Sequence, residues 1–499
     1  MAGVVVVSLA LLFWIALRWY HPGEEIASVD YIPEYAPLIA FEKTFFAWNE
    51  TTSPFGGFGS PVFATYFLFF GALAIFGVGF AQTLFSWLLM ATAWIGMYSL
   101  SRGLTLRPLA AFMAAWTYTL SPVAQFLPTF TTGFEFFAAL PWVLWSAHRS
   151  AVHASSRRTV AAILIAASFL VLPWIAATPQ LFFELVLVAT AWCIFLLPRA
   201  TRGFFAWVLV TASTCVIAAS WWLVPVFFAL FGNQVTKTSM IENPAFAFAN
   251  SSLLNNLRFI PQWFWSYPNI IPYARGYDHN IAVYTAGFWS AIVICIGLLL
   301  AKRLKYASYT RFFAGLFVVG LFITKGAHSP LQQINSLIYH VPGFFLLQEP
   351  AGTMIASLLA ACVVLAIVMD HATSLAREKI FARAGLAALV AASTAAALLV
   401  SSPLLNALVF SGANDYVSLP HYWRQASAYI NAAGGDGWVL VLPRDRHYQA
   451  IYDWGFRAMD GVPVELIERA VLLTGPTWDY VTDPRLEALK RNIDGMLLT

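Results

Sequence analysis

The sequence predicts an all-α polytopic integral membrane protein with a small outward-facing α/β segment near its C-terminal end. Of its 499 residues, 60% are hydrophobic and only 10% are charged, a composition too apolar for a soluble protein of this length. Apolar runs recur along the chain, and the charged residues gather in the connections between them. We expect about eleven transmembrane helices of roughly 20 residues each, because that length crosses the hydrocarbon core of a bilayer.

The first apolar run, Met1–Leu17, is predicted to be a retained membrane span. It has no basic N-terminal region and no small-residue cleavage site leading into a soluble domain. Residues 19–80 are predicted to form the first outer loop, which is rich in acids: Glu24, Glu25, Asp30, Glu34, Glu42 and Glu50. Because carboxylates are costly at membrane depth, such a group beside the bilayer indicates either a solvated loop or a chemical purpose.

The apolar stretch Pro61–Phe80 is predicted to be an interfacial helical segment and not a span. If it crossed the membrane, every later basic cluster would lie on the same side as the acid-rich loop, unless the N-terminus were outside. Its proline, its glycines Gly71 and Gly77 and its crowded aromatic residues suit a helix that lies along the outer interface.

Basic residues predict the orientation of the later spans, because cytoplasmic connections carry an excess of Lys and Arg. Five clusters break the apolar runs: Arg102/Arg107, Arg149/Arg157/Arg158, Arg199/Arg202, Lys302/Arg303/Lys305/Arg311 and Arg377/Lys379/Arg383. The connections expected to face outward are poor in Lys and Arg for their length: Leu127–Glu135, Thr178–Gln180, Gly232–Tyr284, Lys325–Pro350 and the chain after Pro403.

The composition changes after Pro403. His421–Ala433 places Tyr422, Ala426 and Tyr429 on one helical face before Gly434, and Trp438–Leu442 is typical of a short buried strand. We therefore predict two parts, a membrane domain over 1–402 and an outward-facing α/β domain over 403–499, which is truncated or very small.

Several soluble chemistries are excluded. The four cysteines, Cys193, Cys215, Cys295 and Cys362, lie in apolar runs and indicate neither disulfides nor a metal site. The sequence has no nucleotide-phosphate loop, no His-Glu-x-x-His and no Cys-x-x-Cys, and nothing in it points to nucleic acid. A secondary transporter stays open as an alternative, because Glu184 is a rare acid within an apolar run.

The order of features resembles the GT-C superfamily of membrane glycosyltransferases. More closely, it is similar to the large cell-wall arabinofuranosyltransferases of the alpha-(1->3) type and to the YfhO-type membrane proteins. The similar stretches run over most of the chain: Ser28–Glu50, Phe55–Leu73, Tyr118–Phe126, Ala177–Glu184, Thr324–Pro350 and Tyr422–Pro443.

This resemblance implies an inverting sugar transfer on the outer face of a prokaryotic cytoplasmic (inner) membrane. The donor would be a polyprenyl-phosphate sugar such as decaprenyl-phosphate arabinofuranose, and the acceptor a cell-envelope glycan or a lipid-linked glycan. Asp30 matches the first-loop acid of the family and would be the general base, with Glu34 four residues further on. The alternative is a non-catalytic or transporter-like YfhO relative that handles lipid-linked sugars.

The chain departs from the pattern where a phosphate-binding arginine is expected. Gln348 and Gly352 stand where the similar families carry basic residues. The remaining outward cations are Lys237, Arg258, Arg275, His279, Lys325, His328 and His340. We predict Lys325 and His328 as the donor-phosphate ligands, because they lie in a glycine-punctuated loop just beyond a span, with Arg258 and Arg275 next; the alternative is that they only reach for the interface.

Trp263, Trp265, Tyr267 and Glu135 are predicted to bind the acceptor glycan. The aromatic residues could instead belong to the aromatic belt of the membrane interface, since such belts have the same composition. No cofactor is firmly implied, although a divalent cation is compatible with the chemistry.

The predicted topology can be tested with introduced cysteines. Cysteine at Ser155 or Ser308 should be shielded from an impermeant thiol reagent in intact cells, whereas cysteine at Ser53 or Asn255 should react. Labelling of positions 155 and 308 but not of position 53 would show that the orientation in the membrane is the reverse of the predicted one.

Overall fold

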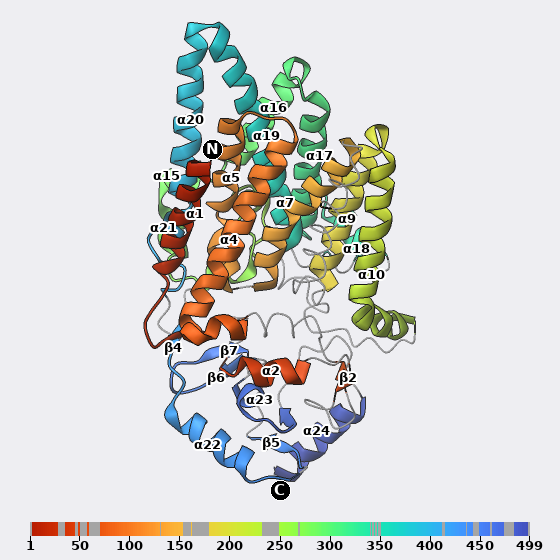
Figure 1. The fold of residues 1–499 in the computed structure, drawn as a ribbon, viewed down its shortest axis with the longest axis vertical. Coiled ribbons are helices and arrows are strands. Elements are labelled where there is room, and N and C mark those ends of the chain that lie inside the picture. Colours follow the sequence, from red (N-terminus) through yellow and green to blue (C-terminus); the bar gives the residue numbers. More distant parts are fainter. Residues whose placement is uncertain are drawn as a thin grey trace.

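The computed structural model describes residues 2–27, 35–44, 48–49, 57–58, 70–129, 131–152, 161, 179–231, 249–267, 270–339, 341, 344, 347, 351–411, 415–435, 437–442, 449–459, 462–473 and 484–497. A bundle of long helices occupies one part of the molecule, and a smaller α/β part covers one end of the bundle (Figure 1). The bundle helices are α1 (Ala2–Leu17), α4 (Val78–Gly103), α5 (Pro108–Thr119), α7 (Thr131–Val152), α9 (Pro179–Leu196), α10 (Arg202–Phe231), α16 (Trp289–Leu300), α17 (Ala307–Thr324), α19 (Ala351–Glu378) and α20 (Ile380–Val400).

Helix α19 lies at the centre of the bundle. It is apolar on all sides, and every residue from Gly352 to Met369 is buried. It packs against α5, α7, α9, α16, α17 and α20. In contrast, α20 leaves Ile380 and Phe381 71% and 90% exposed, as expected for a helix with a lipid-facing side.

The protein is a polytopic membrane protein, as predicted. Six described helices are long and apolar enough to cross a membrane: Val78–Gly103, Gln180–Arg199, Ile281–Arg303, Ala307–Thr324, Gly352–Glu378 and Ile380–Val400. Helices α1, α5, α7 and α10 lie alongside them (Figure 1). The expected number of about eleven spans stays a prediction, because most of the chain between α7 and α9 lies outside the described residues.

The basic connections meet at one end of the bundle, here called the basic end. Arg199 at the end of α9 donates to the Ser308 hydroxyl at 3.2 Å, and the Thr105 and Tyr306 hydroxyls lie 2.6 Å apart. The Arg107 amide donates to Asp370 Oδ1 near the end of α19 at 2.8 Å. These contacts join the connections after α4, α9 and α16 to the C-terminal part of α19, so their positive charges lie on the same side.

Figure 1 shows the α/β part at the opposite end, here called the loop end. Its elements after α20 are α21 (Ser402–Leu405), β4 (Tyr416–Val417), α22 (His421–Ala432), β5 (Val439–Val441), β6 (Gln449–Ile451), β7 (Arg457–Met459), α23 (Val462–Leu466), β8 (Val471–Leu473) and α24 (Pro484–Leu497). β5 pairs in parallel with β8, and β6 pairs with β7 as an antiparallel hairpin. The helix and the strand predicted at the start of this part are therefore both present, but the strand is not buried as predicted, since Leu440 and Leu442 are 41% and 44% exposed.

Short helices complete the loop end. They are α2 (Pro37–Thr44), α6 (Val123–Phe126), α13 (Leu253–Leu257), α14 (Ala274–His279), α15 (Ile281–Ala286) and α18 (Gln332–Tyr339), with the 3-10 turns η1 (Ala74–Phe76), η2 (Leu127–Thr129) and η5 (Trp263–Ser266). The first outer loop also holds a two-residue pairing of β2 (Trp48–Asn49) with β3 (Gly57–Phe58).

The described part of the stretch predicted to be interfacial, from Phe70 onward, lies at the loop end. A Cβ added at Gly71 would lie 3.6 Å from the Pro37 side chain of α2, and one added at Gly79 would collide with the Glu24 carbonyl just after α1. Gly77 turns the chain with a φ of 97°, and α4 starts at the next residue. This position agrees with an interfacial segment that leads into α4; residues 61–69 lie outside the described part.

The first outer loop and the C-terminal part fold together. β1 (Glu25–Ile26) pairs antiparallel with β4, and the Gln82 side chain of α4 bonds to both the amide and the carbonyl of Ile26, at 2.8 and 3.0 Å. One apolar cluster draws on both segments: Ala27, Tyr35, Val417, Phe456, Val462 and Leu466. The boundary at 402/403 stays a prediction, but residues after it share a core with residues 27 and 35.

Candidate active site

The two predicted catalytic acids, Asp30 and Glu34, lie outside the described residues, but both flanks of their segment are described. The Ala27 amide donates to the Asp415 carbonyl at 3.0 Å. The Tyr35 amide donates to Glu465 Oε2 at 2.8 Å. Both flanking residues, Ala27 and Tyr35, are buried in the loop-end core.

Glu25 is a first-loop acid whose surroundings are described. Burial raises its pKa to about 7, and the Arg424 guanidinium of α22 opposes that rise. A carboxyl pKa close to neutrality suits general acid-base chemistry. The sequence placed Glu25 only within a group of acids, because its strand partner Val417 and the Arg424 guanidinium are almost 400 residues away along the chain.

Lys325, predicted as a phosphate ligand, follows directly after α17. Its side chain is only 2% exposed, and its Nζ donates to the carbonyls of His328 and Gly326 at 2.9 and 3.4 Å. The ammonium also lies 4.6 Å from the centre of the Phe322 ring. Burial lowers the pKa of Lys325. No acid of the described chain lies within ion-pair distance of it, so only dipoles and a ring balance its charge.

The loop that follows Lys325 is held from two sides. The Ser251 hydroxyl donates to the Lys325 carbonyl at 3.2 Å, just before α13. The buried Asn335 amide of α18 donates to the carbonyls of Gly326 and Phe322 at 2.6 and 2.8 Å. His328, three residues after Lys325, is half-buried in the same loop. The position of Lys325, at the end of α17, therefore depends on Ser251 before α13 and on Asn335 of α18.

The N-terminus of α19 lies next to this loop. The hydroxyls of Thr324 and Thr353 are 2.9 Å apart, and Glu184 Oε1 accepts a hydrogen bond from the Thr353 amide at 3.3 Å. Glu184 is 1% exposed, and a carboxylate is favourable at the positive end of a helix. A Cβ at Gly352 would lie 1.8 Å from Glu184 Oε2. Glycine at this departure from the family pattern therefore makes room for the carboxylate; Gln348 lies outside the described residues.

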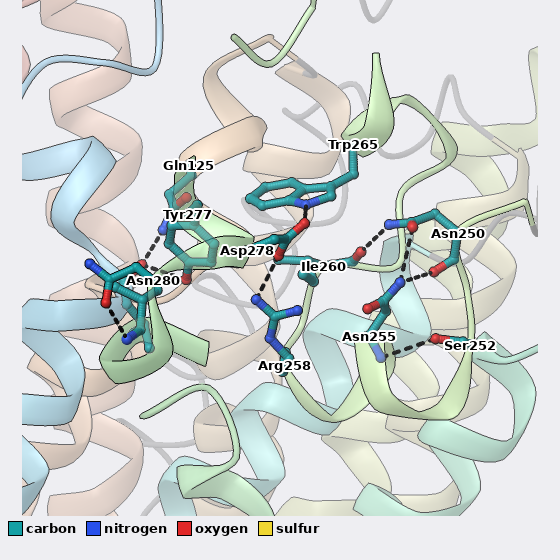
Figure 2. A network of polar contacts seen from close by, with 12 residues as sticks. Gln125, Asn250, Ser252, Asn255, Arg258, Ile260, Trp265, Tyr277, Asp278 and Asn280 are labelled. Carbon is teal, nitrogen blue, oxygen red and sulfur yellow. Dashed lines mark hydrogen bonds and ion pairs between the residues drawn. The ribbon is translucent and has the colours of Figure 1, made fainter. Parts of the chain in front are cut away.

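Arg258 forms an ion pair, in contrast to Lys325. Its Nη2 lies 2.7 Å from Asp278 Oδ1, and the second carboxylate oxygen accepts from the Trp265 indole at 2.9 Å (Figure 2). The guanidinium also lies 4.3 Å from the centre of the Tyr284 ring. Because Asp278 already neutralises it, Arg258 has less charge to offer a phosphate. Arg275 is exposed on α14, where water screens its charge.

The residues predicted to bind the acceptor are not equally accessible. Trp265 is 1% exposed and packs edge-on against Tyr277, with ring centres 5.3 Å apart, so its faces are covered. Tyr267 is 48% exposed, and its ring lies 5.6 Å from that of Trp263. Glu135 is buried on α7. The accessible aromatic surface is therefore the Trp263 and Tyr267 pair.

Other predicted residues fall outside the description or stay unconnected. Lys237 and His340 are not among the described residues, and His279 is exposed at the end of α14. In the described part of the chain, no three His, Cys, Asp or Glu side chains are grouped so that they could hold a metal ion.

A membrane helix bundle with an acid-rich first loop and an α/β part over one end agrees with a membrane glycosyltransferase domain of the GT-C class. The chain belongs to the family described as alpha-(1->3)-arabinofuranosyltransferase, N-terminal GT-C domain, whose model matches residues 62–470. No curated protein matches the sequence.

The fold is shared with a solved structure, and a second enzyme superposes more weakly. The cryo-EM structure of the arabinofuranosyltransferase AftD from Mycobacteria superposes with a TM-score of 0.63 and 17% identity, over 95% of this chain and 32% of that chain. A mutant of the same protein gives 0.60 and 18%, over 95% and 33%. ArnT from Cupriavidus metallidurans, bound to undecaprenyl phosphate, gives 0.41 and 11%, over 99% and 88%. The chain thus spans about a third of the length of the mycobacterial enzyme.

The Arg258–Asp278 pair can be tested by thermal unfolding in detergent. Asp278→Asn keeps the shape but leaves a buried guanidinium without its counter-charge, so we expect a loss of about 1–3 kcal/mol of stability. Arg275→Gln, an exposed charge on the same helix as Asp278, should change stability by less than about 0.5 kcal/mol. Equal unfolding midpoints for the Asp278 variant and the wild type would mean that Arg258 keeps an unneutralised charge.

Proposed function

We propose that this chain carries the sugar-transfer site of an inverting membrane glycosyltransferase. The donor is a polyprenyl-phosphate sugar, with arabinofuranose as the favoured sugar, and the acceptor is a cell-envelope glycan. The site faces outward from the inner membrane. The observation that carries this proposal is the family match over residues 62–470, which includes Lys325 and the C-terminal part as far as residue 470.

In the proposed reaction, Asp30 accepts the proton of the acceptor hydroxyl as its oxygen attacks the anomeric carbon. The bond between that carbon and the phosphate oxygen breaks on the opposite face, and polyprenyl phosphate leaves with the bonding electrons. A positioned carboxylate suits the first task, and a poorly solvated cation suits the second. Glu34 orients groups beside Asp30.

Lys325 is the cation that we favour for the leaving phosphate. Among the described residues, the carbonyls of Gly326 and His328 and the Phe322 ring face its charge and no acid lies within ion-pair distance, so an incoming phosphate would gain a full charge-assisted contact. Arg258 would first have to give up Asp278. His328 shares the loop with Lys325 and is the second ligand in this proposal.

Trp263 and Tyr267 are the proposed stacking surface for the acceptor glycan, since an exposed aromatic face can pack on a sugar ring. Trp265, in the same turn, donates to Asp278 and packs edge-on against Tyr277. Its ring is covered, so it does not stack on the sugar itself. Glu135 of α7 is the fourth residue proposed at the acceptor site.

A second candidate function is a non-catalytic relative that handles lipid-linked sugars. The observation that favours it is the loss of basic residues at Gln348 and Gly352, together with the Glu184 carboxylate that fills the space beside Gly352. A carboxylate at this helix N-terminus would repel a phosphate.

The base is tested by Asp30→Asn, which keeps size but removes proton-accepting power. We expect transfer to fall by about two to four orders of magnitude with an unchanged unfolding midpoint, and Glu34→Gln to cost less. Transfer from a polyprenyl-phosphate arabinofuranose donor is measured by product chromatography. Near-normal turnover of the Asp30 variant would remove this role, and a parallel Glu25→Gln variant would show whether that acid serves instead.

The phosphate ligand is tested by Lys325→Ala and His328→Ala. Loss of a charge-assisted donor to the leaving group costs roughly 3 kcal/mol, so turnover should fall about a hundredfold and donor binding should weaken. Gln348→Arg should partly restore both. Lys302→Ala, an exposed cation at the basic end, should behave as wild type. If no outward cation affects donor binding or turnover, the non-catalytic function is the better one.

A further inference from the structure

Glu465, on α23, is a buried acid that the sequence did not single out. It is 4% exposed, and its Oε2 accepts the Tyr35 amide at 2.8 Å across a separation of 430 residues. A neutral side chain such as glutamine could satisfy one amide, whereas a buried carboxylate costs free energy unless a cation faces it. The choice of an acid therefore needs a second partner.

The cation on which the charge of Glu465 acts is Lys43, in the last turn of α2. It is 8% exposed, and its Nζ donates to three carbonyls of the chain around α23: Val464 at 2.6 Å, Arg469 at 3.2 Å and Ile467. Burial lowers the pKa of Lys43 to about 8, against the opposing effect of the carboxylates of Glu465 and Glu468. Glu465 thus helps to keep this buried lysine charged near neutral pH.

Charged groups on the neighbouring elements are few in the described chain. Glu465 and Glu468 are the acids that act on Lys43 from α23 and the turn after it. Arg469 faces Lys43 through its carbonyl, while its guanidinium donates to the carbonyls of Ile430 and Gly434. On α2 itself, Glu42 is exposed.

These contacts fix the two flanks of the acid-bearing segment to the C-terminal part. Tyr35 is held by Glu465, and α2, which begins two residues later, is held by Lys43. On the other flank, Ala27 is held by the Asp415 carbonyl, while Gln82 of α4 ties the adjoining Ile26 to the helix bundle. The C-terminal part therefore sets where the first outer loop sits relative to the bundle.

We propose that Glu465, together with Lys43, is a positioning residue for sugar transfer that acts through Tyr35 and α2 on the first outer loop. This inference rests on the proposed function. Neither residue touches the substrates. The hydrogen bonds of Glu465 and Lys43 join Tyr35 and α2 to the chain around α23, and small displacements of a reacting group reduce its rate sharply.

The test compares Glu465→Gln and Lys43→Met with the wild type, measuring kcat, KM for the donor and the unfolding midpoint. Glutamine keeps an acceptor for the Tyr35 amide, so the fold should persist while kcat falls about 10- to 100-fold with KM little changed. Asp453→Asn, an exposed acid in the turn between β6 and β7, is the matched control and should stay within about twofold of wild type. Lys43→Arg, which keeps the charge, should recover part of the activity lost in Lys43→Met.

The pH dependence separates positioning from simple support of the fold. Because the folded-state pKa of Lys43 is about 8 and its ordinary value is 10.5, the unfolded chain binds more protons between these values. Stability contributed by this group therefore rises with pH above 8. Turnover should instead fall as Lys43 loses its proton, and in Glu465→Gln that fall should move to lower pH. A merely structural role would make turnover follow stability.

The outcomes are distinct. An unchanged kcat in Glu465→Gln overturns the positioning role. So does a fall in kcat that is accounted for by a lower unfolding midpoint. In both cases the proposed function stands. No transfer by the wild-type protein overturns the proposed function and this inference with it.

Discussion

The structure depends on the complete burial of α19 within the protein. A membrane helix usually has a lipid-facing side, but α19 is surrounded by other helices from Gly352 to Met369. Its backbone groups are satisfied internally, as the bilayer requires, and its apolar side chains give its neighbours a surface on every side. This central position also brings its N-terminus next to Thr324 and Lys325, where α17 ends. The candidate site is thus a consequence of where the most buried helix begins.

At the loop end, three of the buried cations in the described chain are stabilised in three different ways. Arg258 has a carboxylate partner in Asp278, Lys43 has carbonyls with acids close by, and Lys325 has carbonyls and a ring but no acid within ion-pair distance in the described chain. In the first, the Asp278 carboxylate neutralises the guanidinium of Arg258. In the second, the hydrogen bonds of Lys43 join α2 to the chain around α23. In the third, no acid of the described chain lies within ion-pair distance of the cation, and for this reason we propose Lys325 as the phosphate ligand. Electrostatic environment, and not residue type, therefore separates these cations in role.

Apolar runs and basic clusters were enough to predict a polytopic helical protein, because both follow from the cost of placing polar groups in a bilayer. The family resemblance, carried by motifs in a fixed order, was confirmed by the match over residues 62–470. The helix at 421–432 and the strand at 439–441 were also predictable, because local periodicity and glycine punctuation mark them. Lys325 was chosen as a candidate phosphate ligand because it lies just beyond an apolar run, a signal that is local in the chain.

The sequence by itself determined the class of fold, the sidedness of the basic connections and the identity of candidate charged residues, because these depend on composition and on neighbours along the chain. Only the tertiary structure decided which charges are neutralised, which aromatic faces are covered and which segments hold the first outer loop. Glu465 and Tyr35 are 430 residues apart, and Lys43 and Val464 are 421 apart. The chain carries no local signal for such pairs, since they form only when the C-terminal part packs against the first outer loop.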